Sequence, residues 1–153
     1  MKKNYIILIS LIGLLMAAGI VILYVQKSAA VAKECGNVAP KEKDDCYARI
    51  AAGKNDASLC EKIQTSADLQ SNCYTNIAVQ LNDSSTCDKI QNSNPNVKEL
   101  CYSSVASAKH NPSACERIQN SDLRNQCLAT AKNDASFCAN IKDSGVKVYP
   151  CSS

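Results

Sequence analysis

Apolar residues in the later two-thirds of the chain recur with the period of a helix. After Cys46, Cys73 and Cys101, apolar residues stand four and five places later, and in the later copies another stands four places before the cysteine. These offsets fall on one face of a helix with 3.6 residues per turn. The pattern therefore predicts a long amphipathic helix in each copy.

A second, shorter helix is predicted after each long one. Its cysteine has Asp or Asn four places before it and Ile three places after it. Asp and Asn are favoured N-cap residues, and Pro112, which follows Asn111, suits the first helical position. The N-cap candidates are Asp56, Asp83, Asn111 and Asp134, and the isoleucines are Ile63, Ile90, Ile118 and Ile141. Cysteine and isoleucine then share one apolar stripe.

The two helices together form an internal repeat. Residues 46–64 read CYARIAAGKNDASLCEKIQ, residues 73–91 read CYTNIAVQLNDSSTCDKIQ, and residues 101–119 read CYSSVASAKHNPSACERIQ. A shortened copy, CLATAKNDASFCANIK, occupies residues 127–142. Self-similarity of this kind is typical of stacked repeat architectures.

The chain before the repeats has the features of a membrane anchor. Lys2 and Lys3 precede residues 5–25, a stretch of 21 residues without a charge. As a helix this stretch would be about 31 Å long, which is enough to cross the hydrocarbon core. The basic end is favoured in the cytoplasm. We therefore predict a cytoplasmic N-terminus at residues 1–4, a transmembrane helix at 5–25, a stem and first cysteine turn at 26–45, and extracytoplasmic repeats at 46–153.

A cleaved signal peptide is the alternative for this segment. The apolar region of a signal peptide usually covers 7–15 residues, and this one is longer. An Ala-x-Ala pattern occurs at residues 30–32, some way past the apolar stretch. The protein is expected to be a single-pass membrane protein with its C-terminal domain outside, or a secreted protein if the segment is cleaved.

The ten cysteines predict a disulfide framework. An even number at regular spacing behind an export segment is typical of an oxidising compartment. The chain has no Trp and one Phe, so the core of large side chains is small and cross-links would compensate for it. The cysteines are Cys35, Cys46, Cys60, Cys73, Cys87, Cys101, Cys115, Cys127, Cys138 and Cys151.

Two pairing schemes fit the repeat. In one, the two cysteines of each copy pair, as Cys46 with Cys60, and Cys35 is left to pair with Cys151. In the other, neighbours pair in order, as Cys60 with Cys73. Hairpin geometry favours the second scheme, because Cys60 lies about 6 Å before the end of its helix and Cys73 about 9 Å into the next. For Cys46 and Cys60 the corresponding distances along each helix from the connecting turn are about 10 Å and 4–5 Å. This larger mismatch is harder for a disulfide to bridge.

The recurring phrase L/T/A/F-C-x-K/R/N-I, followed by C-Y-x-x-I/V-A, resembles membrane-anchored, cysteine-rich helical-repeat proteins of microbial envelopes. The paired helices are also similar to the α-solenoid class that includes tetratricopeptide and Sel1-type repeats. The copies here are shorter, and the Trp/Gly/Tyr signature of those families is absent. The resemblance implies an all-α, solenoid-like array of disulfide-stapled helical hairpins, and it implies no catalytic or binding residue.

The sequence offers little support for catalysis or metal binding. No two cysteines are closer than 11 residues, so the Cys-x-x-Cys pair of a thiol oxidoreductase or a zinc site is missing. The single histidine, His110, lies beside a cap residue. The repeat position explains Asp44 and Asp56 as residues of a helix N-terminus and a cap. We therefore predict no catalytic residue, metal site or cofactor.

A binding or scaffold module for a protein partner is the function that the repeats favour. Stacked hairpins form an extended surface, and Tyr47, Tyr74 and Tyr102 recur at one position that we expect to be exposed. The alternative is a structural envelope subunit that self-assembles through the N-terminal helix, as in a pilin-like filament. Nucleic acid is not an expected partner, because the net charge of +3 includes Lys2 and Lys3 and leaves the rest close to neutral.

Overall fold

The computed structural model describes residues 34–143 and Cys151. The predicted N-terminus, the membrane helix and residues 26–33 of the stem lie outside the described residues. Among those that are described, no helix combines the length and the apolar character needed to cross a membrane. The chain divides into two units, residues 1–39 and 40–153, and the second carries the repeats.

The repeat unit consists of a long α-helix followed by a short 3₁₀ helix, four times over. No strand occurs in the described part of the chain, which confirms the all-α prediction. The elements are α2 (Pro40–Lys54), η1 (Ala57–Lys62), α3 (Ala67–Leu81), η2 (Ser84–Lys89), α4 (Asn96–Lys109), η3 (Pro112–Arg117), α5 (Ser121–Lys132) and η4 (Ala135–Asn140). Because α2 begins at Pro40, residues 40–45 belong to the first long helix.

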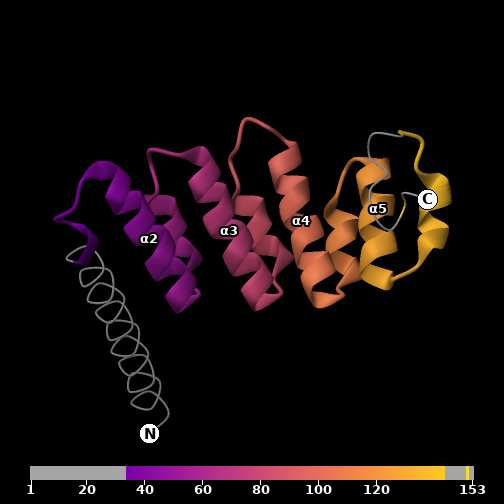
Figure 1. The fold of residues 1–153 in the computed structure, drawn as a ribbon, viewed down its shortest axis with the longest axis horizontal. Coiled ribbons are helices and arrows are strands. Elements are labelled where there is room, and N and C mark those ends of the chain that lie inside the picture. The colour runs from indigo at the N-terminus through magenta and orange to yellow at the C-terminus, as the bar shows by residue number, and fades with distance from the viewer. Residues whose placement is uncertain (1–33, 144–150, 152–153) are drawn as a thin grey trace, which may run out of the picture. The chain divides into compact units, whose positions relative to one another are not determined.

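The helices stack in sequence order. Each long helix contacts the next one. The 3₁₀ helices η1, η2 and η3 each pack between the long helix before and the long helix after, and η4 packs on α5. Figure 1 shows α2 to α5 side by side in one row. Within residues 40–143 this is the arrangement of a solenoid, in which each repeat packs on its neighbours.

The core runs along the row as a line of small and branched side chains. The residues four and five places after the long-helix cysteine are buried in every full copy, and Ile77, Ala78, Val105 and Ala106 are completely inaccessible. The isoleucine that follows each 3₁₀ helix is also buried, with exposed fractions of 1–4%. The predicted apolar stripes are therefore the packed faces.

Sequential disulfides join each 3₁₀ helix to the next long helix or, for η4, to Cys151. The bridges are Cys60–Cys73, Cys87–Cys101, Cys115–Cys127 and Cys138–Cys151, with Cα–Cα distances of 5.3–5.8 Å. Cys35 and Cys46 are disulfide-bonded as well, so no described cysteine is free. The scheme that pairs neighbours in order is confirmed for these four bridges, and the scheme that pairs cysteines within a copy is wrong.

The turn from each long helix to its 3₁₀ helix has one geometry. The residue after the helix is left-handed, with φ between 49° and 52°, at Asn55, Asn82, His110 and Asn133. The next amide N–H returns to the carbonyl of a buried alanine, as from Asp83 to Ala78 at 2.9 Å. This is the six-to-one bond of a Schellman motif, and Asn is one of the few residues besides Gly that tolerates the left-handed conformation.

The predicted N-caps are confirmed, although the helices that they cap are 3₁₀ and not α. The side chain of each cap residue accepts the amide N–H of a serine two places later, as from Ser85 to Asp83 at 2.9 Å. Hydrogen bonds from Ser85 and Ser136 also lower the pKa values of Asp83 and Asp134. Six residues lie between each cap and the extended isoleucine, so each 3₁₀ helix is longer than the usual run of three or four residues.

Among the left-handed residues of the described part of the chain, His110 is the one that is not asparagine, and its replacement is expected to stabilise the domain. The left-handed conformation costs a non-glycine residue about 1–2 kcal/mol, and glycine is the usual residue at this place. We expect His110→Gly to raise the free energy of unfolding by about 0.5–1 kcal/mol in a urea titration. Lys109→Gly, one residue earlier in helical conformation, should lower it by about 1 kcal/mol. Equal effects of the two substitutions would contradict this account of the turn.

Candidate functional site

The three repeated tyrosines are buried, so the expectation that they form an exposed ladder is wrong. Tyr47, Tyr74 and Tyr102 have exposed fractions of 9%, 2% and 5%. The position after the cysteine lies 100° around the helix from it, on the side that the adjoining 3₁₀ helices cover. The rings therefore support the repeats, and Tyr74 and Tyr102 also line grooves between them.

At two junctions a tyrosine meets an acid from the preceding repeat and a base from its own repeat. The second of these sets, which we call triad II, consists of Asp88, Tyr102 and Arg117. The Tyr102 hydroxyl donates to the Asp88 carboxylate, Arg117 pairs with the same carboxylate, and the guanidinium lies 5.4 Å from the centroid of the Tyr102 ring. The triad thus links η2, α4 and η3.

Triad I is the equivalent set one repeat earlier, Glu61, Tyr74 and Lys89. The Lys89 ammonium lies 3.3 Å from the Glu61 carboxylate. Burial raises the pKa of Tyr74, and the negative charge of Glu61 raises it further. At the third junction the corresponding residues are Glu116, Leu128 and Asn140, so neither the tyrosine nor the base is present.

The three groups of triad II fix one another's ionisation. Burial works against ionised Asp88, but hydrogen bonds from Arg117 and Tyr102 outweigh burial and lower its pKa. Burial and the Asp88 bond raise the pKa of Tyr102, and Asp88 raises that of Arg117. At neutral pH the triad holds a carboxylate, a neutral phenol and a guanidinium. The side chains of Asp88 and Arg117 are about 40–45% exposed. Their ion pair therefore fixes the positions of the side chains more than it stabilises the fold.

Each triad borders a groove between repeats. Groove I, of about 360 Å³, is lined by Glu61, Gln70, Tyr74, Lys89 and Gln91. Its position between two repeats is the same as that of the groove beside triad II. The two grooves share a tyrosine, a base and a glutamine at matching places in the repeat.

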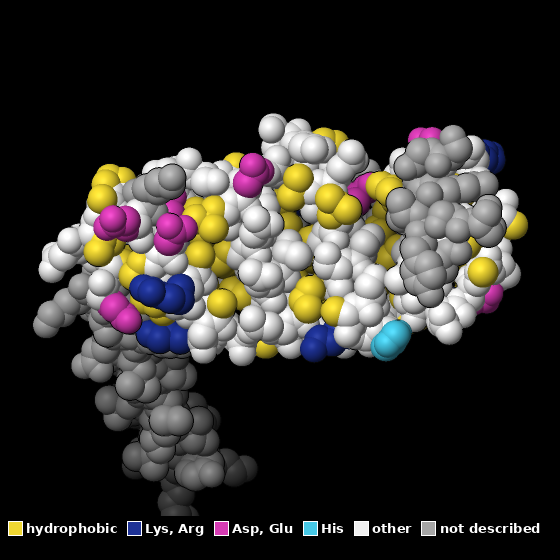
Figure 2. Space-filling view, in the orientation of Figure 1, with side chains coloured by type: hydrophobic (Ala, Val, Ile, Leu, Met, Phe, Trp, Pro, Cys, Tyr) yellow, Lys and Arg dark blue, Asp and Glu magenta, His cyan; other side chains and the backbone are white. Residues whose placement is uncertain are grey.

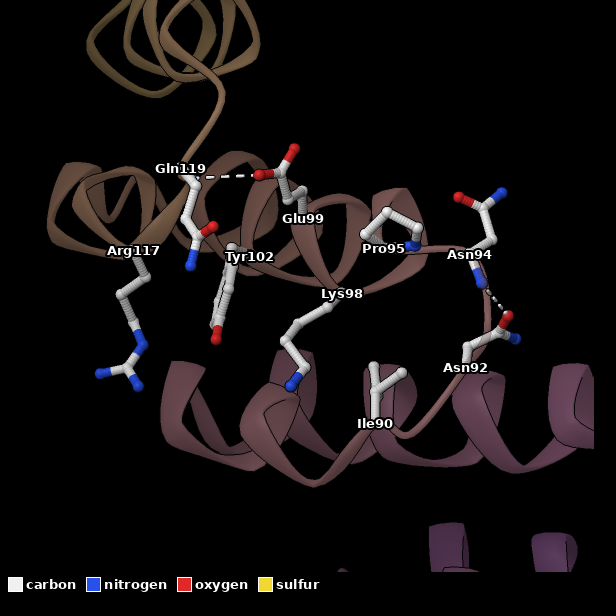
Figure 3. A pocket seen from close by; sticks show the side chains of 9 residues that line it. All are labelled: Ile90, Asn92, Asn94, Pro95, Lys98, Glu99, Tyr102, Arg117 and Gln119. Atoms are coloured by element: carbon white, nitrogen blue, oxygen red, sulfur yellow. Dashed lines mark hydrogen bonds between the residues drawn. The ribbon is translucent and has the colours of Figure 1, made fainter.

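Groove II, of about 320 Å³, is the richer of the two in hydrogen-bonding side chains. It is lined by Ile90, Asn92, Asn94, Pro95, Lys98, Glu99, Tyr102, Arg117 and Gln119. In Figure 3 Lys98 extends from its helix toward the neighbouring helical segment, and the Gln119 side chain lies beside Tyr102. The Lys98 ammonium donates to the Asp88 carbonyl at 3.2 Å, which uses one of its three protons.

An inserted linker forms one side of groove II. Five residues, 91–95, separate Ile90 from α4, whereas three follow Ile63 and two follow Ile118. Asn92 and Asn94 shape the longer linker by accepting the amide N–H two residues on, each at 3.0 Å. In repeat proteins, insertions often fall on the binding face. Groove II is therefore the candidate site.

Acidic side chains of the long helices hold the other linkers. Glu99 Oε1 accepts the amide N–H groups of Gln119 and Asn120, each at 3.1 Å. Asp44 accepts the two linker amides after η1 on its two oxygens, and Asp122 accepts the two amides after η4 on one oxygen. Although Glu99 lines groove II, its bonded oxygen is engaged. Among the lining groups, the Lys98 ammonium keeps two protons beyond its one bond, and the Gln119 side chain is exposed.

Charged side chains are unevenly distributed on the surface. Figure 2 shows Lys, Arg, Asp and Glu gathered over α2, while neutral polar and hydrophobic side chains predominate over α3 and α4. In residues 34–143 and Cys151, no three His, Cys, Asp or Glu side chains are arranged to hold a metal. Groove II thus offers hydrogen bonds and a cation to a ligand.

Sequence reasoning missed the residues of groove II. It selected Tyr102 for exposure, but Lys98, Gln119 and the acid–base pairing across repeats were not identified. A usable signal was present, because an acid and a base follow the cysteine in Glu61-Lys62, Asp88-Lys89 and Glu116-Arg117. Comparison with protein-family models, with curated proteins and with solved structures finds no match to this chain.

Proposed function

We propose that the chain is an extracytoplasmic binding or scaffold module, held at the membrane by residues 5–25, that binds a protein partner through groove II. The inserted linker of residues 91–95 carries this proposal, because it lies beside the Lys98 ammonium and the Gln119 carboxamide. The disulfides support an oxidising compartment. A solenoid supports a binding role because its repeats present an extended surface.

The alternative of a pilin-like structural subunit depends on residues outside the described part of the chain. It requires the N-terminal helix to assemble with other copies. No feature of the described repeats favours it over a binding module.

Site-specific photocrosslinking of the full chain in its native envelope tests the proposal. A photoreactive residue replaces Gln119 in groove II or, as the control, Ser107. Ser107 is exposed and lies nine residues from Lys98 on α4, which is half a turn around the helix. We expect a discrete adduct from position 119 and none from position 107.

Loss of the Lys98 charge should weaken that adduct. Lys98→Met keeps most of the side-chain stem and removes the ammonium, while Lys98→Arg keeps a cation. We expect the adduct at position 119 to fall several-fold with methionine and to persist with arginine. Adducts of equal yield at positions 119 and 107, or at neither, would remove groove II as the binding site.

A further inference from the structure

Grooves I and II recur at the spacing of packed helices. Both grooves have the same place in the repeat, and the two helices that border them, α3 and α4, contact each other directly. Packed helices lie about 8–10 Å apart. A linear ligand that contacts both grooves with equivalent groups must therefore repeat about every 9 Å.

A polyproline II segment has this period. It advances about 3.1 Å per residue with three residues per turn, so equivalent side chains recur about every 9.3 Å. In a β-strand, side chains on one face recur about every 6.7 Å, and an α-helix advances 5.4 Å per turn. Neither of those spacings matches one repeat.

The glutamines of the two grooves suit the backbone of such a segment. Gln91 in groove I and Gln119 in groove II are exposed and occupy the same place in the repeat. A carboxamide can donate to a carbonyl and accept from an N–H, and the backbone groups of polyproline II have no partners within the segment. Gln64 occupies the same place in the first repeat.

Charge distinguishes the two grooves. At the position three residues before the long-helix cysteine, groove II has Lys98 and groove I has Gln70. The Gln70 amide donates to the Ile63 carbonyl at 3.0 Å, so this side chain is neutral and engaged. Lys89 of groove I pairs with Glu61, and Arg117 of groove II pairs with Asp88. A carboxylate would therefore complement the Lys98 ammonium in groove II, whereas a neutral residue suits groove I.

We infer that the partner is an extended peptide in the polyproline II conformation, with an acidic side chain beside Lys98 in groove II and a neutral residue three positions away in groove I. This inference rests on the proposed function, which it specifies by partner class and spacing. The peptide crosses the repeats and runs along the row of helices.

Binding of synthetic peptides to the oxidised full chain in detergent tests this inference. The probe is the blocked peptide Pro-Pro-Gln-Pro-Pro-Glu-Pro-Pro with a fluorescent label, and its binding is measured by fluorescence anisotropy. We expect affinity to fall at least tenfold when the Gln and Glu are placed two positions apart, and also when Glu is replaced by Lys. Equal binding of all three peptides, or no binding of the first, overturns the inference.

Matched protein variants test where on the protein the peptide binds. Lys98→Met should weaken binding about tenfold and Lys98→Arg should leave it within about twofold. Lys109→Met makes the same charge change on the same helix, about 16 Å away, and should have no effect. Equal losses with Lys98→Met and Lys109→Met would show a general charge effect and overturn the placement.

The two proposals can fail separately. If position 119 forms a specific adduct while the peptides do not bind, the partner class is wrong and the binding role stands. An adduct that resists proteases but is removed by glycan-cleaving enzymes would identify a polysaccharide partner and overturn the peptide inference. Absence of both the adduct and peptide binding overturns both proposals.

Discussion

Reduction of the disulfides is expected to unfold the repeat array. The four bridges with known partners close loops with sequence separations of 12 to 14 residues. In the chain-entropy model a loop of about 15 residues contributes about 3 kcal/mol, so the four together are worth on the order of 10 kcal/mol. This equals the whole stability of many domains, which is about 5–15 kcal/mol.

Far-UV circular dichroism in dithiothreitol measures this result. We expect most of the helical signal of residues 40–143 to be lost without denaturant, and the oxidised protein in the same buffer is the control. The central pair can be compared with the terminal one. Cys87→Ala with Cys101→Ala should lower the free energy of unfolding more than Cys138→Ala with Cys151→Ala. The reason is that Cys87 and Cys101 are at most 1% exposed. A sharp thermal transition retained in reductant would contradict the expectation.

Asp44→Asn is expected to cost much more than Glu99→Gln, although both replace an acid by its amide. Asp44 is 3% exposed and uses both carboxylate oxygens. Oδ1 accepts the Gln64 N–H at 3.2 Å, while Oδ2 accepts the Thr65 N–H at 2.7 Å and the Thr65 hydroxyl. Asparagine has one acceptor oxygen, so its NH₂ group must face a donor N–H. We expect a loss of about 2–3 kcal/mol.

Glu99→Gln is the matched control because Glu99 accepts both of its N–H donors on one oxygen. A glutamine oxygen can keep both bonds, and the loss should stay below about 1 kcal/mol. Urea unfolding of the two oxidised variants measures the difference. Equal losses would show that charge, and not the number of acceptor oxygens, holds the linkers.

The Asp44 contribution should also depend on pH. Burial acts to raise the pKa of Asp44, but the hydrogen bonds from Thr65 and Gln64 outweigh it, so the folded pKa is lowered. The stabilisation is therefore complete above the unfolded value of about 4 and is lost as the pH falls through the folded value. Between pH 6 and pH 3, Asp44→Asn should lose less stability than the parent chain.

The features that sequence could predict are local ones. The pairing of Cys60 with Cys73 depends on how far each lies from a short linker, and the helical rise is enough to compare those distances. Caps such as Asp83 depend on groups two residues away. These predictions are confirmed because they involve single hairpins.

The features that sequence could not predict depend on contacts between repeats. Tyr74 and Tyr102 are buried because η1 and η2, which belong to the preceding repeats, pack against α3 and α4. Glu99 reaches amides 20 and 21 residues away. The short helices of six residues could form either α-helical or 3₁₀ hydrogen bonds. The apolar stripe of Cys and Ile does not decide between the two patterns.

The sequential bridges also set how far the chain can be drawn out under tension. Under a pulling force along the row, the segment inside each closed loop carries no load, because the force passes through the sulfur–sulfur bond. About half of the chain between Pro40 and Cys151 lies in such loops. A fully extended residue spans about 3.3–3.6 Å, so the oxidised array would reach roughly half the contour length of a reduced one. The oxidised array would therefore behave as a tether whose extension is limited by its cross-links.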